Sequence, residues 1–194
     1  MKRIEWISSI LFYSMVLFTF ICYNAIRDDC MSKSKQKKVM FIASTGGHLN
    51  ELLQLAPMFS EFDYTLVTEK TKSNMGLRDK HKGRVHYIIS GTYTTLKAKL
   101  IYPFKLLGNC FISLFLMLKI RPDVVVTTGS HNVGPMCCLA KIFGKKVIFI
   151  ETFANSNSPT KCGRLVYKFA DHFIVQWESM LEYYPNAIYG GWIY

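Results

Sequence analysis

Short apolar runs and helical segments alternate along the chain from Lys38 onward. Six runs are rich in β-branched and aromatic residues, and several are apolar at successive positions, as parallel strands buried on both faces are. They cover residues 39–44, 64–69, 85–90, 124–129, 147–152 and 173–177. Apolar residues at helical spacing occur between them over 48–59, 134–144 and 163–170. This βαβα order predicts one α/β domain over residues 39–194, with a Rossmann-like, doubly wound parallel sheet.

Residues 6–26 differ from the rest of the chain, because they are mostly apolar and contain no charged residue. As a helix, this stretch is long enough to cross the core of a bilayer. A secretory signal peptide would have a shorter apolar region and a small-residue cleavage site, which the closing Tyr23-Asn24-Ala25-Ile26 does not provide. We therefore expect an N-terminal transmembrane helix within residues 1–27, followed by a basic linker over residues 28–38.

Basic residues gather beside the apolar segments. The net charge is +11, and the linker carries more lysine than the few residues that precede the anchor. This bias predicts that the folded domain lies on the cytoplasmic face of a membrane. Anionic lipid headgroups explain the basic clusters as well as nucleic acid would, and the sequence has no nucleic-acid-binding motif. We expect membrane lipid as a partner and no nucleic acid.

A second uncharged stretch covers residues 106–118, with lysine and arginine on both sides. It is too short to span a bilayer comfortably and would suit a helix that lies in the membrane interface near residues 104–119. A buried crossover helix between the third and fourth strands has the same periodicity. The predicted anchor favours membrane contact.

The six cysteines indicate neither a disulfide framework nor a zinc site, because no C-x-x-C spacing is present. We interpret them as reduced thiols that serve as small apolar residues in a cytoplasmic domain. No metal ligands are predicted.

Two glycine-containing turns follow predicted strands and precede predicted helices. The turns contain Thr45, Gly46, Gly47 and His48, and Gly129, Ser130, His131, Asn132 and Gly134. In an open α/β sheet such turns lie at the carboxyl ends of the strands, where ligands bind. Glycine lets backbone N–H groups approach a bound oxygen, and a helix amino terminus favours negative charge. Together the turns predict one substrate-binding site, whereas a single turn of this kind is equally typical of a structural connection.

Two side chains beside these turns are candidates for chemistry. His48 could act as a base or could donate to a phosphate or hydroxyl, and the alternative is a solvated histidine at a helix start. Glu151 ends the fifth predicted strand and precedes a polar run that contains Asn155. We interpret Glu151 as a contact to a substrate hydroxyl; the alternative is a strand-end residue in water.

Several reaction classes lack their motifs. The sequence has no D-x-D pair, no G-x-x-x-x-G-K-[ST] loop and no G-x-S-x-G elbow, so hydrolysis of nucleotides or esters is not indicated. The first turn does not supply the G-x-G-x-x-G of a dinucleotide-binding enzyme. Glu69 ends the second strand, where a ribose-binding acid would lie, and this keeps an NAD-type oxidoreductase open.

Three stretches carry a resemblance to a known family: VMFIASTGGHLNELLQL, PDVVVTTGSHNVGPMCCLAKIFGKKVIFIET and YKFADHFIVQW. Together they resemble bacterial exopolysaccharide and capsule glycosyltransferase subunits of the PssD/CpsF type. They are similar also to the membrane-anchor subunit of the eukaryotic transferase that adds the second GlcNAc to the dolichol-linked chitobiose core. Both groups resemble the amino-terminal half of a GT-B glycosyltransferase. The first loop here lacks the leading glycine of the peptidoglycan enzyme with that fold.

The resemblance implies a heteromeric UDP-sugar-dependent transferase, of which this chain is the membrane-anchoring and acceptor-side subunit. UDP-Gal or UDP-GlcNAc would be the donor substrate, a polyprenyl-diphosphate-linked sugar the acceptor, and no metal or other cofactor would be needed. A separate subunit would supply the donor-binding, carboxy-terminal GT-B half, and this chain alone would be inactive. The segment 186–194 is a candidate docking segment; the alternative is a last strand in its own sheet. Capsule-type motifs favour a bacterial plasma membrane.

A rival from another class is a non-catalytic membrane scaffold that recruits a soluble transferase without contributing a side chain. Replacing His48 or Glu151 would separate the two, because a pure scaffold would lose partner binding or nothing. The donor sugar, the linkage and the role of His48 as base or phosphate ligand stay open at this point.

Overall fold

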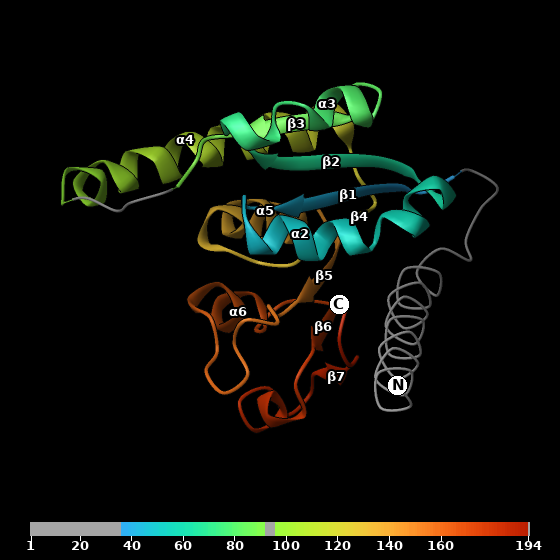
Figure 1. The fold of residues 1–194 in the computed structure, drawn as a ribbon, viewed down its shortest axis with the longest axis vertical. Coiled ribbons are helices and arrows are strands. Elements are labelled where there is room, and N and C mark those ends of the chain that lie inside the picture. Colours follow the sequence, from blue (N-terminus) through green and yellow to red (C-terminus); the bar gives the residue numbers. More distant parts are fainter. Residues whose placement is uncertain (1–35, 92–95, 194) are drawn as a thin grey trace, which may run out of the picture.

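In the computed structural model, the described residues are 36–91 and 96–193, and they contain a seven-stranded, fully parallel sheet (Figure 1). The strand order is β3-β2-β1-β4-β5-β6-β7. The strands are β1 (Lys38–Ala43), β2 (Asp63–Glu69), β3 (Val85–Ile88), β4 (Val124–Thr127), β5 (Lys146–Ile150), β6 (His172–Val175) and β7 (Ile188–Tyr189). The chain therefore winds outward first on one side of β1 and then on the other, which confirms the predicted doubly wound fold. The predicted anchor and most of the linker lie outside the described residues.

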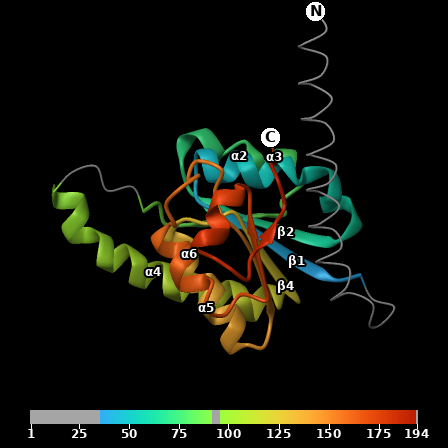
Figure 2. The ribbon, with the colours of Figure 1, turned by 90° about the horizontal axis from the view of Figure 1, so that it is seen from below.

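Helices cover both faces of this sheet (Figure 2). The α-helices are α2 (Gly47–Gln54), α3 (Leu77–Lys80), α4 (Leu96–Ile120), α5 (Gly134–Ile142) and α6 (Lys161–Val166). Short 3₁₀ helices join them: η1 (Ala56–Glu61), η2 (Lys72–Asn74), η3 (His131–Val133) and η4 (Glu178–Glu182). Helix α2 and η1 pack on one face, whereas α4, α5 and α6 pack on the other.

The alternation of side chains along each strand divides the core into two layers. On β1, Phe41 and Ala43 join the layer beneath α2, and Met40 and Ile42 join the layer beneath α4 and α5. All four are completely buried. Both faces are thus covered, which is why the strands read as continuous apolar runs in the sequence.

The two predicted helices over 48–59 and 163–170 differ from the structure in their limits. The first is interrupted after α2, because Pro57 has no N–H for a helical hydrogen bond and its ring clashes with the preceding turn, so the chain continues as η1. The second begins earlier, because Thr160 caps α6: its Oγ1 accepts from the N–H of Gly163 at 2.8 Å.

Helix α4 is longer than the expected interfacial segment near 104–119. It runs for 25 residues, and its stretch Leu100–Ile120 is long and apolar enough to cross a membrane by length and composition, with 22% of the most apolar part buried. The flanking lysines do not end the helix, since lysine is a good helix former. The helix therefore extends beyond the uncharged stretch 106–118 at both ends, and its length alone does not distinguish a spanning helix from an interfacial one.

The last segment belongs to the sheet. Strand β7 pairs in parallel with β6, and the N–H of Ile193 donates to Gln176 Oε1 at 3.1 Å. Trp192 packs against Trp177, with 5.1 Å between ring centroids. The alternative for 186–194, a last strand in its own sheet, is correct for β7, although Tyr189 is still 47% exposed.

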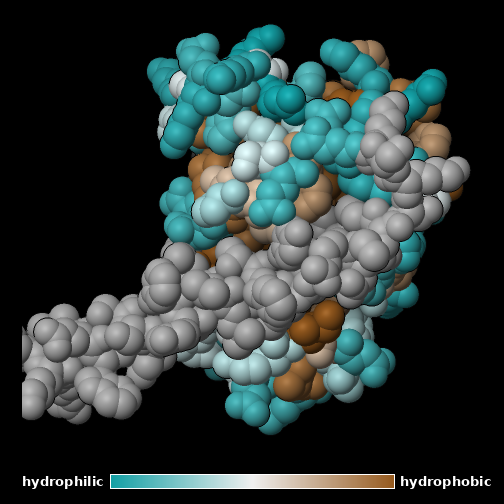
Figure 3. All heavy atoms as spheres, turned by 90° about the vertical axis from the view of Figure 1, so that its right-hand side faces the viewer, coloured by the Kyte–Doolittle hydropathy of each residue, from teal (hydrophilic) through white to brown (hydrophobic). Residues whose placement is uncertain are grey.

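The amino edge of the sheet differs from the carboxyl edge described below. Its described surface is mostly hydrophilic (Figure 3). Arg84 and Asp63, at the amino ends of β3 and β2, form an exposed ion pair there, with 2.8 Å between Nη1 and Oδ1. Such an exposed pair contributes about 0 to 1 kcal/mol to the free energy of unfolding.

Candidate active site

Three loops meet at the carboxyl edge of the sheet because their strands β1, β4 and β5 are neighbours. They are the turn from β1 to α2, the turn from β4 to α5, and the longer connection from β5 to α6 (Figure 1). The first two turns are in direct contact. The predicted convergence of the two glycine-containing turns therefore holds in the structure.

His48 makes that contact. Its Nδ1 lies 2.8 Å from the carbonyl oxygen of Thr128, and the Thr128 hydroxyl donates back to the carbonyl of His48 at 2.6 Å. A carbonyl oxygen only accepts, so Nδ1 carries the hydrogen of the neutral ring and Nε2 holds the lone pair. The half-buried imidazole is thus oriented with Nε2 as its basic atom. Thr128, which sets this orientation, was not identified from the sequence.

The backbone around His48 has conformations that favour glycine. Gly46 has φ +82° and ψ −139°, and Gly129 has φ +95°. A Cβ on Gly129 would lie 3.1 Å from Phe149 Cζ, which is a tight contact, and 3.8 Å from His48 Nδ1, which is an ordinary van der Waals contact. Ser130 adopts φ +95° without being glycine, and strain of this kind concentrates at functional sites.

Helix α2 begins at this edge without a side-chain cap. Gly46 and Gly47 are exposed, no side chain accepts a cap hydrogen bond at Gly46, and the first turn contains no acidic residue. The first N–H groups of a helix lack partners within it and carry a partial positive charge. The edge beside His48 is therefore suited to an anion such as a phosphate.

Glu51 lies one turn further along α2 and was not identified from the sequence. It is 2% exposed and accepts hydrogen bonds from Thr152 Oγ1 at 2.7 Å, from Phe153 N at 3.2 Å and from Gln176 Nε2 at 3.3 Å. Burial raises its pKa from 4.5 to about 7, against the opposing effect of these hydrogen bonds. It connects α2 to the loop after β5. The sequence offered one indication that Glu51 has a specific role: its carboxylate lies on the apolar face of the predicted helix, three residues after His48.

Glu151 has an interior environment. Its carboxylate is 1% exposed and accepts from Tyr184 OH at 2.8 Å and from Thr160 Oγ1 at 3.2 Å. Burial raises its pKa. A Cβ on Gly163 would come within 2.0 Å of Glu151 Oε2, so the side chain is closely enclosed. Glu151 is therefore not a strand-end residue in water, and its carboxylate does not open onto the surface where a substrate would bind. The geometry favours a role in holding the loop after β5.

Glu69 and Asn132 are paired. Asn132 Nδ2 donates to Glu69 Oε1, and Ser90 Oγ donates to Glu69 Oε2 at 3.1 Å. Both Glu69 and Asn132 are buried, and Asn132 Oδ1 has no hydrogen-bond partner within the described residues. The pair ties the ends of β2 and β3 to the turn after β4. The Glu69 carboxylate thus accepts hydrogen bonds from Asn132 and Ser90 at the position where a ribose-binding acid would accept them from a ribose.

The other predicted residues lie along the same edge. Thr45 Oγ1 accepts from Asn74 Nδ2 at 3.1 Å, His131 begins η3, and Gly134 begins α5. Asn155 lies in the turn after β5, with its N–H 3.3 Å from the Thr152 carbonyl. Within the described part of the chain, no three histidine, cysteine or acidic side chains are grouped to hold a metal ion.

The fold and the arrangement of these loops define the class: the domain is one half of a GT-B-type fold. MurG from Acinetobacter baumannii has a similar fold with a TM-score of 0.58 and 22% identity, over 74% of this chain and 42% of that one. UDP-GlcNAc 2-epimerase from Methanocaldococcus jannaschii, in complex with UDP-GlcNAc and UDP, has a similar fold with a TM-score of 0.55. It is 16% identical, over 75% of this chain and 42% of that one. The chain thus covers less than half the length of these structures.

The chain belongs to the family of Alg14-like oligosaccharide biosynthesis proteins, whose model matches residues 38–193. The human UDP-N-acetylglucosamine transferase subunit ALG14 is 26% identical, over 79% of this chain and 81% of that protein. The corresponding subunit from Schizosaccharomyces pombe is 25% identical, over 95% of this chain and 96% of that protein. The pyrophosphoryl-undecaprenol N-acetylglucosamine transferase of Burkholderia ambifaria is 27% identical over 83% of this chain and 43% of that protein.

Proposed function

We propose that this chain is the acceptor-side subunit of a two-chain glycosyltransferase, which moves a sugar from a UDP-sugar to a polyprenyl-diphosphate-linked sugar. The observation that carries the proposal is His48, whose Nδ1 is fixed by the Thr128 carbonyl beside the uncapped start of α2. The names of the relatives favour UDP-GlcNAc over UDP-Gal as the donor. They also favour lipid-linked oligosaccharide synthesis, with bacterial exopolysaccharide or capsule synthesis of the PssD/CpsF type as the other setting.

The proposed reaction is a single displacement. A hydroxyl of the acceptor sugar attacks the anomeric carbon of the donor, the bond from that carbon to the UDP oxygen breaks, and UDP leaves. His48 Nε2 accepts the proton of the hydroxyl as the new glycosidic bond forms. The N–H groups at the start of α2 stabilise phosphate charge near the reacting atoms. No metal or further cofactor enters this step.

The buried carboxylates act through position in this scheme. Glu51 holds the start of the loop after β5 from α2, and Glu151, at the end of β5, accepts from Thr160 at the other end of the loop, so the segment around Asn155 keeps its place beside the two glycine-containing turns. Gly129, Ser130, Asn132 and Gly134 shape the middle turn. Glu151 is thus proposed as a positioning residue.

A second chain is proposed for the donor half. The described domain corresponds to 42% of MurG, and relatives matched over most of their length are named as subunits. The partner would carry most of the UDP-sugar contacts, and the pair would work with the catalytic cleft between them. The chain by itself would be inactive.

Attachment to the cytoplasmic face of a membrane is proposed from α4. Large apolar side chains on its outer side are exposed, including Phe104 at 74% and Phe111 at 66%. Exposed apolar surface of this extent indicates contact with a membrane or a partner. A lipid-linked acceptor would lie in that membrane, and the predicted anchor over 1–27 would add to the attachment.

The test is transfer from labelled UDP-GlcNAc and UDP-Gal to polyprenyl-diphosphate GlcNAc, with and without the candidate donor-binding subunit. Transfer only by the pair, lost in His48→Ala and kept in the control His86→Gln on edge strand β3, supports the proposal. Full transfer by a pair that contains His48→Ala would instead favour the non-catalytic scaffold. Transfer by this chain alone would refute the two-chain scheme.

A further inference from the structure

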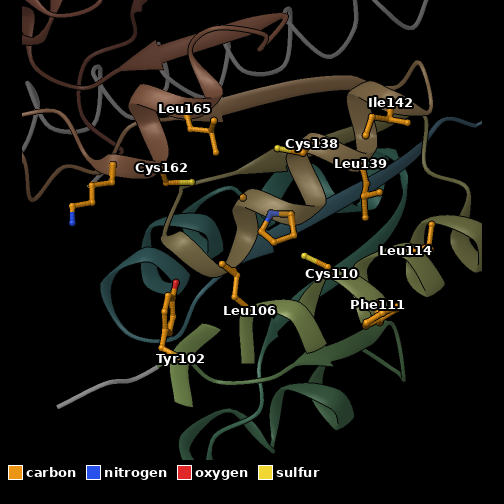
Figure 4. A pocket seen from close by; sticks show the side chains of 13 residues that line it. Tyr102, Leu106, Cys110, Phe111, Leu114, Cys138, Leu139, Ile142, Cys162 and Leu165 are labelled. Carbon is orange, nitrogen blue, oxygen red and sulfur yellow. The ribbon is translucent and has the colours of Figure 1, made fainter. Parts of the chain in front are cut away.

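An apolar groove lies between α4, α5 and α6, on the face of the sheet opposite α2 (Figure 4). It has a volume of about 630 Å³, and its lining is almost entirely apolar. Cys110, Cys138 and Cys162 turn toward it from the three helices. Nothing in the reaction scheme above uses this groove.

The groove has two distinct ends. Helices that follow or precede parallel strands run antiparallel to them, so the start of α4, the start of α5 and the start of α6 all lie at the carboxyl edge of the sheet. Tyr102, Gly134 and Lys161 therefore line the end beside the candidate active site. Leu114 and Ile142 line the end that lies away from it.

Among the described residues of the lining, the charge lies at the end beside the active site. Lys161 is the one charged residue among them, and the amino terminus of α5 lies at the same end with no acidic residue in its first turn. An occupant with a negatively charged head and a long apolar tail would place its head beside Lys161 and its tail along the apolar walls. A free sugar or nucleotide would not, because the walls offer few polar groups to replace its hydration.

The groove continues into an exposed apolar surface. Phe111, Leu114 and Ile142 line it and are 66%, 36% and 78% exposed, and Phe104 and Leu107 extend the same outer side of α4. An amphiphile that leaves a membrane beside α4 would reach the groove without its tail crossing water. Continuity of this surface with the groove favours a lipid over a soluble ligand.

We propose that this groove binds the first isoprene units of the polyprenyl acceptor, with the diphosphate at the Lys161 end. The inference rests on the proposed function and adds to it the part of the acceptor that the chain recognises. The lipid tail is then held by this chain, and the sugar is presented to His48 at the carboxyl edge of the sheet, where α4 and α5 begin.

Alkylation of the groove thiols tests the proposal without requiring sugar transfer. The full chain in detergent micelles is treated with N-ethylmaleimide, and modification of Cys110 and Cys138 is followed residue by residue by mass spectrometry. Burial raises the pKa of Cys138, so the reaction is run at alkaline pH. At a decaprenyl phosphate concentration about ten times its Kd, we expect modification to slow about tenfold.

Three comparisons decide the outcome. Protection by decaprenyl phosphate with none by inorganic diphosphate or by a phospholipid of similar length supports the proposal. Equal protection by the phospholipid would overturn the assignment to an isoprenoid chain and leave a general lipid contact. An absence of protection by all three would overturn the groove as a lipid site, whatever the transfer assay gives.

A groove-filling variant links the site to the acceptor. Cys138→Trp places a large ring in the groove, and Leu118→Trp adds the same ring to the outer side of α4, where Leu118 is 54% exposed and outside the lining. With the partner subunit present, we expect Cys138→Trp to raise the KM for a long-chain acceptor about tenfold, equivalent to about 1.4 kcal/mol. A shortened acceptor should show little change. Leu106→Gln provides a second variant should the tryptophan prevent folding.

Loss of the chain-length preference in Cys138→Trp but not in Leu118→Trp supports the groove. An unchanged preference in Cys138→Trp and Leu106→Gln would overturn it. If the wild-type pair transfers nothing, the proposed function fails, and the alkylation experiment still decides whether the groove binds an isoprenoid chain.

Discussion

Helices α2 and α4 lie against opposite faces of one sheet, yet they expose opposite kinds of side chain. On α2 the outward residues Asn50 and Gln54 are polar, and Leu49 and Leu52 are buried. On α4 the outward side is a stripe of large apolar residues: Leu100, Ile101, Phe104, Leu107, Phe111, Phe115 and Leu118. The exposed side of α2 is therefore polar, whereas the exposed side of α4 is apolar.

The buried side of α4 explains how the stripe is held outward. Asn109 is completely buried, and its side chain pairs with the backbone of Ile89: Oδ1 accepts from N–H at 2.8 Å and Nδ2 donates to C=O at 3.0 Å. Gly108 allows this approach, because a Cβ there would lie 2.8 Å from Ile89 Cδ1. A buried amide is costly to leave unpaired, so this pair fixes the rotation of α4 about its axis.

The largest expected effect is the loss of sugar transfer in His48→Ala, which changes the α2 face and leaves the α4 face as it is. His48→Ala removes the oriented base and should lower sugar transfer by the complete pair about 10²- to 10⁴-fold, the usual contribution of a general base. Sedimentation with vesicles should be unchanged, because His48 lies on the α2 side. Initial rates with both substrates saturating measure the effect. A loss of vesicle binding together with transfer would mean that the two faces are not independent.

Glu51 gives the α2 face a pH dependence. Its pKa in the folded chain is about 7 and its unfolded value is near 4.5, so the folded chain binds more protons between these values and becomes less stable as pH rises from 4.5 to 7. The shift corresponds to a free energy of unfolding on the order of 3 kcal/mol. Glu51→Gln should remove this dependence.

Urea unfolding of the wild type and of Glu51→Gln in the same detergent, at several values between pH 5 and pH 8, measures the effect. The difference between the two proteins isolates Glu51 from the other groups that titrate in this range. A constant difference across the range would show that Glu51 does not change its protonation on unfolding.

The α4 face should determine membrane attachment. Replacing Phe104, Phe111 and Phe115 by serine removes apolar surface that is already exposed in the folded domain, so its stability should change little. Partitioning onto vesicles should weaken by about 2 kcal/mol or more, roughly 30-fold. The control replaces Asn50 and Gln54 of α2 by serine and should partition as the wild type does. Equal weakening by both sets would contradict the assignment of the faces.

Periodicity and turn chemistry predict the sheet and the position of the two glycine-containing turns, because these features are local in the sequence. His48 is found in this way. Thr128 and Glu51 are not, since the roles of both depend on contacts 80 to 125 positions away in the chain. Glu151 illustrates the same limit: its place at a strand end was predicted, but enclosure by Tyr184 and Gly163 is a property of tertiary packing. The length of α4 was underestimated because lysines were interpreted as its ends.

The smallest expected effect concerns how the imidazole is held. Thr128→Val removes the hydroxyl that donates to the His48 carbonyl, and it keeps the Thr128 carbonyl that accepts from Nδ1. The lost hydrogen bond should cost about 0.5 to 1.5 kcal/mol in the free energy of unfolding. Transfer should change far less than in His48→Ala, and the pH profile of transfer should keep its shape, because a backbone carbonyl sets the tautomer. A profile displaced in Thr128→Val would show that the hydroxyl, and so the side chain, takes part in orienting the base.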